Sequence, residues 1–144
     1  MSHIREATPD DRPRLLAIQA TSLESNWPTL LETAITGPAT VLVAGHTPVG
    51  YALAVGTQPT HLAELAVAPG HRNAGHGSAL LRAILGRSEE CRLTARADDE
   101  RARRFYERHG FRVESYLPDH YENADGVAMV RQADSSDAAV PDRN

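Results

Sequence analysis

Three side chains in this sequence of 144 residues can give or take a proton at positions that suggest a reactive site. His61 and Glu64 belong to an apolar segment, and imidazole and carboxylate groups are common general bases. Tyr106 lies in an arginine-rich segment further on, and its phenol can act as an acid or a hydrogen-bond donor. Since His61 and Glu64 are three residues apart, a regular strand places them on opposite faces. At most one of them then lines a given site, unless a bulge intervenes.

A glycine-containing loop follows the same apolar segment and offers a place for an anion. Arg72-x-x-Gly75-x-Gly77 leads directly into an amphipathic helix pattern. The first N–H groups of a helix point outward, the helix dipole adds positive potential, and glycines let a diphosphate approach the main chain. Arg72 can add a charge-assisted contact. The spacing matches neither of the two common nucleotide-binding glycine fingerprints, so the loop taken by itself also suits a simple turn.

Apolar periodicity and turn signals predict the elements that position these groups. Helices are expected at 8–20, at 29–36, from 75–77 through Leu85, and from Asp98 to His109, where Gly110 suits the left-handed position after a helix. Strands are expected at 2–6, 40–44, 49–55, 61–67, 91–95, 111–116 and 127–131. This order predicts an α/β fold, a mixed sheet with helices on its faces.

Composition limits the class of protein. Hydrophobic residues make up 41%, enough for the core of one domain, and the net charge of −4 argues against nucleic acid as a partner. All 15 basic residues are arginine and Cys91 is the only cysteine, which excludes lysine Schiff-base chemistry and an intrachain disulfide. The histidines show no metal-ligand spacing, and no segment has the pattern of a signal peptide or a membrane span. We therefore expect a cytoplasmic protein with no metal and no membrane partner, with a domain at 1–132 and a polar, disordered tail at 133–144.

A second segment, Leu93-Thr-Ala-Arg-Ala-Asp-Asp-Glu-Arg-Ala-Arg-Arg-Phe-Tyr-Glu-Arg-His-Gly-Phe111, shows which family the sequence resembles. Together with the loop at Arg72, it closely resembles the GNAT superfamily of N-acetyltransferases. Those enzymes have an Arg/Gln-x-x-Gly-x-Gly/Ala loop and a later block Asn-x-x-Ala-x-x-Phe-Tyr-x-x-x-Gly-Phe. Positions matching the later block are Ala102, Phe105, Tyr106, Gly110 and Phe111, while Asp99 stands where the family usually has asparagine. The resemblance runs from Ile4 to about Arg131. It implies a single-domain GNAT fold, with a mixed, mostly antiparallel sheet of about seven strands flanked by about four helices.

The resemblance also implies acetyl-CoA as co-substrate and assigns residues to it. Backbone groups of Leu65, Ala66 and Val67 would pair with the pantetheine arm. Main-chain N–H groups would hold the diphosphate along Arg72, Asn73, Ala74, Gly75, His76, Gly77 and Ser78. Tyr106 would face the coenzyme thiol as general acid, and Ala102 and Phe105 belong to the same coenzyme-binding block. Apart from the resemblance, the charge of Arg108 on this arginine-rich helix makes it a candidate to reach the phosphates, and a solvated helix face is the alternative. Asp99 would lie beside the pantetheine, and because it cannot donate as an asparagine amide does, we expect weaker coenzyme binding.

Two proton acceptors remain open for a direct attack of an amine on the acetyl group in a ternary complex. The segment at His61 resembles arylalkylamine N-acetyltransferases, in which a histidine at this position serves in proton removal. The ribosomal-protein alanine N-acetyltransferases instead place a glutamate on the fifth strand, where this sequence has Thr94. We expect His61 to be the base, acting through a water molecule, with Glu64 as the second candidate.

The acceptor is indicated by two further resemblances to the ribosomal-protein alanine type. They are Trp27-Pro28 and the ending from Tyr116 to Met129, in which His120-Tyr121 replaces a Tyr-Tyr pair. They imply that Trp27 and Tyr121 contact a protein or peptide N-terminus. One alternative is a small-molecule amine, for which Glu64, Asp119, Glu122 and Asp125 supply negative charge. Another is a non-catalytic coenzyme A-binding regulatory module, but the presence of Tyr106 argues against it. Monomer and homodimer are both open.

Overall fold

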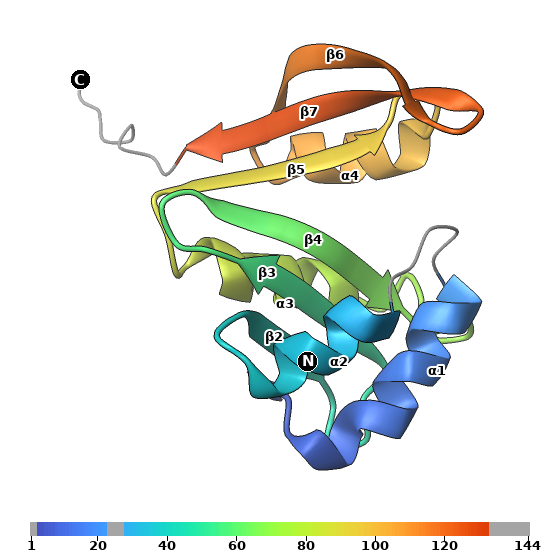
Figure 1. Cartoon of the computed structure of the whole chain (residues 1–144), viewed down its shortest axis with the longest axis vertical. Helices are drawn as coiled ribbons and strands as arrows, with labels where there is room; N and C mark the ends of the chain where they lie inside the picture. Colours follow the sequence, from blue (N-terminus) through green and yellow to red (C-terminus); the bar gives the residue numbers. More distant parts are fainter. Residues whose placement is uncertain (1–2, 23–27, 133–144) are drawn as a thin grey trace. The chain divides into compact units, whose positions relative to one another are not determined.

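A computed structural model describes residues 3–22 and 28–132 of the chain (Figure 1). A short 3-10 turn (Pro9–Asp11) leads into the first helix. The other elements are β1 (Ile4–Glu6), α1 (Arg12–Ser22), α2 (Pro28–Thr36), β2 (Thr40–Ala44), β3 (Gly50–Val55), β4 (Thr60–Val67), α3 (His76–Leu85), β5 (Glu90–Arg96), α4 (Glu100–Arg108), β6 (Arg112–Tyr121) and β7 (Ala124–Gln132). The seven strands of the described part follow the hydrogen-bonded order β1-β2-β3-β4-β5-β7-β6. Because β4–β5 is parallel while β1–β2, β2–β3, β5–β7 and β6–β7 are antiparallel, the predicted mixed, mostly antiparallel α/β fold is confirmed.

The chain forms two compact units that alternate along the sequence. The first unit contains Met1–Gly56 and Leu62–Arg87, and the second contains Thr57–His61 and Ser88–Asn144. The parallel pairing of β4 with β5, Thr60 opposite Cys91 and His61 opposite Arg92, lies within the second unit. That residues 1–132 act as one domain stays a prediction, and the tail predicted at 133–144 lies outside the described residues.

The core of the first unit lies between its strands and the pair α1–α2. Leu15 and Ile18 of α1 and Leu31 of α2 are almost fully buried, together with Val43 and Leu53 of the sheet. Alternate strand residues face the other way, because side chains point to opposite sides of a sheet. A Cβ at Gly50, for example, would lie 3.4 Å from Leu80 of α3. The strands β2 and β3 are therefore covered on both faces, as Figure 1 shows, and this explains why their sequences are almost continuously apolar.

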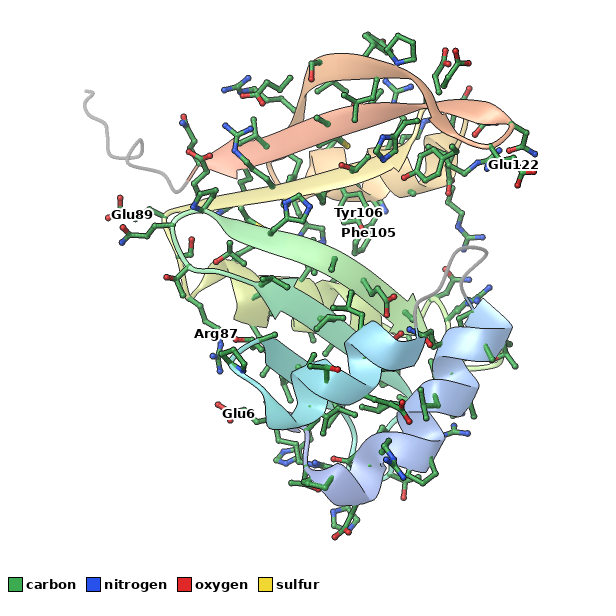
Figure 2. All side chains as sticks on the ribbon, in the orientation of Figure 1. Glu6, Arg87, Glu89, Phe105, Tyr106 and Glu122 are labelled. Carbon is green, nitrogen blue, oxygen red and sulfur yellow. The ribbon has the colours of Figure 1, made fainter. Side chains whose placement is uncertain are left out.

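Two ion pairs hold β1 within the first unit. Arg5 Nη1 and Nη2 contact the two carboxylate oxygens of Asp11 at 2.8 and 2.9 Å. The same carboxylate accepts a hydrogen bond from the backbone N–H of Thr8 at 2.8 Å, as a residue in the first turn of a helix often does. Arg5 holds the pKa of Asp11 below its usual range. A weaker, exposed pair joins Glu6 and Arg87, whose side chains approach each other in Figure 2.

The second unit contains α4 and the antiparallel strands β5, β7 and β6. Alternate residues of β5 are buried, as the period of a half-covered strand requires. Gly110 follows α4 with φ +94°, which confirms the predicted left-handed position. One expectation was wrong. The last two strands were expected at 111–116 and 127–131, but β6 continues to Tyr121 and β7 begins at Ala124. Pro118 is tolerated because β6 is an edge strand and its regular pairing with β7 is interrupted between Leu117 and Tyr121.

Candidate active site

The predicted anion loop lies in the first unit, between the end of β4 and the start of α3. The helix begins at His76, with Gly75 at its N-cap and φ +89°, and Asn73 also adopts a left-handed φ of +63°. A Cβ at Gly75 would meet no atom within 4 Å, so the backbone angle, and not crowding, favours glycine there. The exposed Arg72 donates its Nε–H to the carbonyl of Val67 at 3.1 Å. This bond ties the loop to β4 through Nε, and the guanidinium has further N–H donors on Nη1 and Nη2.

Glu64 lies in the middle of β4, where two side chains hold its carboxylate. The hydroxyl of Tyr51 donates to Oε1 at 2.7 Å, and Nε2 of Gln19 donates to Oε1 at 3.0 Å and to Oε2 at 3.1 Å. Tyr51 and Gln19 are almost fully buried, whereas Glu64 is only partly buried. Burial, followed by the hydrogen bond to Glu64, raises the pKa of Tyr51, so this phenol keeps its proton at neutral pH.

Sequence reasoning missed Tyr51 and Gln19, which are 13 and 45 residues away from Glu64. Tyr51 belongs to an apolar strand and has no neighbouring motif. Gln19 carried a usable signal, because it extends the buried face of Leu15 and Ile18 by one helical step while being polar. A polar side chain on the buried face of a helix needs a hydrogen-bond partner.

Tyr106 projects from α4 in the second unit, next to Phe105 (Figure 2). Its ring meets the ring of Phe105 edge-on, with centroids 5.3 Å apart, and the ring of the buried Phe111 at 5.6 Å. Burial raises the pKa of Tyr106, and the neighbouring Cys91, Asp99 and Tyr121 raise it further. Tyr106 is therefore a neutral hydrogen-bond donor throughout the range near neutral pH.

Asp99, which departs from the family pattern, has a structural role at the start of α4. Its Oδ1 accepts the backbone N–H of Ala102 at 3.0 Å, which makes Asp99 the N-cap of the helix. An asparagine would cap the helix equally well, so the cap does not require the carboxylate. At the other end of the helix, Arg108 is exposed in the last turn.

Tyr121 lies at the end of the β6–β7 hairpin, where its ring contacts the side chains of Arg96 and His120. The Arg96 guanidinium lies 5.7 Å from the centroid of the Tyr121 ring, and the His120 ring meets the Tyr121 ring edge-on at 4.9 Å. Arg96 also donates to the side chain of Asn123 at 3.1 Å. A Cβ on Gly126 would lie 3.1 Å from the Cβ of His120, so glycine is what lets this histidine lie across β7. Trp27, the other expected acceptor residue, lies outside the described residues.

The remaining expected site residues divide between the two units. Leu65, Ala66 and Val67 belong to the first unit, where Ala66 is buried in the core. His61 belongs to the second unit, where its side chain is exposed. Within the described ranges, no group of three or more histidine, cysteine or acidic side chains is placed to hold a metal ion. No helix of those ranges is long and apolar enough to cross a membrane.

Known structures resemble this chain over nearly its whole length. An Ard1 protein from Thermoplasma volcanium has 27% identity and a TM-score of 0.79, with 92% of this chain and 97% of that chain covered. The ribosomal-protein-S18-alanine N-acetyltransferase from Escherichia coli has 18% identity and a TM-score of 0.84, with coverage of 100% and 98%. NAA60 from Arabidopsis thaliana, solved with a bisubstrate analogue, has 18% identity and a TM-score of 0.80, with coverage of 92% and 99%. A comparison with curated protein sequences gives no significant match.

The family follows from the sequence itself. The model of the acetyltransferase (GNAT) domain matches residues 37–113, which is more than half of the chain and includes both the loop at Arg72 and the block around Tyr106. The resemblance noted from these two motifs is confirmed. The chain belongs to the GNAT family of acetyltransferases and is an enzyme of that class.

Proposed function

We propose that this enzyme transfers the acetyl group of acetyl-CoA to the α-amino group of a protein or peptide. The single observation that supports the use of acetyl-CoA is the structure of the loop before α3. It combines a helix N-terminus, a left-handed glycine cap and an arginine tied to the end of β4. Backbone N–H groups from Arg72 to Ser78 would hold the diphosphate, and the backbone at Leu65 to Val67 would pair with the pantetheine arm.

The proposed reaction is a direct attack. The lone pair of the neutral amine adds to the thioester carbonyl carbon, the C–S bond breaks, and the amine proton passes to a base. His61, acting through water, is the first candidate for that base, and Glu64 is the second. The leaving sulfur accepts a hydrogen bond from Tyr106.

The raised pKa of Tyr106 limits what its phenol can do. A thiol has a pKa of about 8.5, well below that of this phenol, so complete proton transfer from Tyr106 to a thiolate would be uphill. In our proposal Tyr106 therefore stabilises the developing negative charge on sulfur as a donor, and solvent finally supplies the proton of the free thiol.

The acceptor class is supported by the names of similar structures. One of these is a ribosomal-protein-S18-alanine N-acetyltransferase, and NAA60 was solved with a bisubstrate analogue. Tyr121, held by Arg96 and His120, is our candidate on the described part of the chain for contact with a peptide.

A competition assay tests the acceptor. The protein is given acetyl-CoA with an equimolar mixture of small amines and of peptides that begin with free Ala, Ser, Gly or Met. Preferred acetylation of peptides, measured as relative kcat/KM, supports the proposal, and the preferred first residue defines the specificity. Acetylation of polyamines or arylalkylamines with untouched peptides would replace it by the small-molecule alternative. Coenzyme binding without any transfer would favour the regulatory module.

The base is tested separately with His61→Ala and Glu64→Gln. Loss of the acidic limb of the profile of kcat/KM against pH in His61→Ala, with that limb retained in Glu64→Gln, supports the order proposed here. If both variants keep full activity between about pH 6 and about pH 9, neither side chain is the base.

A further inference from the structure

The carboxylate of Glu64 is fixed by more donors than a mobile base would need. Oε1 accepts two hydrogen bonds, from Tyr51 at 2.7 Å and from Gln19 at 3.0 Å, and Oε2 accepts one from Gln19 at 3.1 Å. Both donors come from buried positions on other elements, α1 and β3, so the carboxylate cannot turn without breaking them. Its orientation is therefore determined by the fold.

The same contacts leave the carboxylate of Glu64 able to accept one further hydrogen bond. A carboxylate offers about four lone-pair sites, and three are used here, so one acceptor site remains on Oε2. Glu64 is only partly buried, and no arginine or other cationic side chain is its partner among the contacts found for it in the described residues. A partly desolvated, uncompensated negative charge attracts a cation more strongly than a solvated one does.

Tyr51 and Gln19 remain hydrogen-bond donors to Glu64 across the working range of pH. The pKa of Tyr51 is raised, so its hydroxyl remains a donor across the working range of pH. Because a carboxylate only accepts hydrogen bonds, the Gln19 amide must present its nitrogen to it. Neither neighbour supplies a proton to be exchanged.

We propose that Glu64 binds the positively charged amino group of the acceptor as it arrives, and that Tyr51 and Gln19 position the carboxylate for this purpose. The proposal rests on the acetyl transfer proposed above and gives Glu64 the recognition of the ammonium form instead of proton removal.

Binding without reaction gives the cleanest test. Coenzyme A lacking its acetyl group allows a complex with a peptide that begins with free alanine, and no transfer can occur. Calorimetry then gives the Kd of the peptide for the wild-type protein and for Glu64→Gln at about pH 6.5 and about pH 9, since an α-amino group loses its charge near pH 8. We expect Glu64→Gln to weaken binding roughly 10- to 100-fold at the lower pH, the range of a charge-assisted hydrogen bond, and much less at the higher pH.

The positioning residues and controls complete the experiment. Tyr51→Phe removes one donor and keeps the ring in the core, and we expect it to weaken binding about three- to tenfold at the lower pH only. Glu89→Gln and Tyr116→Phe alter exposed side chains by the same chemical changes and should leave the Kd unchanged. The affinity for the Nα-acetylated peptide should be the same in every variant, because that ligand carries no ammonium group.

Each outcome decides for or against the proposal. A Kd that does not change in Glu64→Gln, or that changes equally at both pH values, overturns it. If the Kd gives either of these results and the wild-type protein still acetylates peptides, only the role of Glu64 is wrong. If the wild-type protein neither binds nor acetylates any peptide, both the peptide acceptor and this inference are refuted.

Discussion

The replacement Tyr106→Phe tests the role of the phenol with little disturbance of the fold. The edge-on contacts at 5.3 Å with Phe105 and 5.6 Å with Phe111 are made by the ring, which phenylalanine retains. We therefore expect the free energy of unfolding to change by less than about 1 kcal/mol. In our proposal, what the variant loses is the hydrogen bond to the leaving sulfur.

The size of the kinetic effect follows from the kind of donor that Tyr106 is. Hydrogen bonds to charged groups contribute about 1.5–3 kcal/mol, which corresponds to a decrease in kcat of about 10- to 150-fold. A phenol that completed the proton transfer would have a role worth up to about 10⁴-fold. Since the pKa of Tyr106 is raised, its proton is lost only above the ordinary tyrosine range, and the decrease should be the same from about pH 6 to about pH 9.5.

Release of coenzyme A thiol, followed continuously across this pH range, gives kcat for both proteins. Tyr116→Phe serves as the matched control, because Tyr116 is 65% exposed on β6 and should not affect the rate. The reasoning fails if Tyr106→Phe keeps kcat within threefold of the wild-type value. It also fails if an alkaline limb of the wild-type profile near pH 8 disappears in the variant, because Tyr106 would then titrate where burial should prevent it.

Three further changes test the fold and the coenzyme site. Asp99→Asn should lower the Kd for acetyl-CoA in calorimetry, because the amide adds a donor, and should change stability by less than about 0.5 kcal/mol, because both residues cap a helix. An unchanged or higher Kd would refute the assigned position of Asp99. Asp11→Ala should cost about 1–3 kcal/mol in urea unfolding near pH 7. The folded-state pKa of Asp11 is lowered, so this stabilisation is present above about pH 4 and is lost as the pH falls through the folded-state value. A cost that does not decrease at all as the pH falls below about 4 would contradict the assignment. Gly50→Ala brings a Cβ to 2.8 Å from the carbonyl oxygen of Ala66 and should cost roughly 1–3 kcal/mol, so an unchanged melting temperature would show that the strands can separate there.

Local patterns predicted most of the secondary structure of this chain. The helix that starts after Gly75 was predicted from the helical spacing of its leucine and isoleucine residues, and the end of the later helix was predicted because Gly110 suits a left-handed backbone. The pair of strands at 111–116 and 127–131 was predicted, but the extension of β6 to Tyr121 and the start of β7 at Ala124 were not, since Pro118 and Asn123 are turn residues by local preference. Pairing with β7 determined the outcome, with a register shift between Leu117 and Tyr121 and a left-handed Asp119 that absorb the irregularity.

The candidate site could be predicted only as far as motifs reach. The loop at Arg72 and the block at Tyr106 are each one continuous stretch of sequence, so the local structure of each follows from the spacing of its residues. The contacts of Glu64 join three elements distant along the chain, and no local signal specifies which carboxylate Gln19 or Tyr51 will meet. For the same reason, nothing in the sequence indicated that Glu64 is held in a fixed orientation while His61 is exposed.

The central claim, acetyl transfer to an amine, is tested most directly by the mass of the product. The protein is incubated with acetyl-CoA and a peptide that begins with free alanine and contains no lysine, and the peptide is fragmented in a mass spectrometer. Our account predicts that one acetyl group appears on the α-amino nitrogen and that the Tyr106→Phe protein forms this product more slowly. An unmodified peptide and unmodified small amines, after prolonged incubation with a protein that demonstrably binds acetyl-CoA, would contradict it.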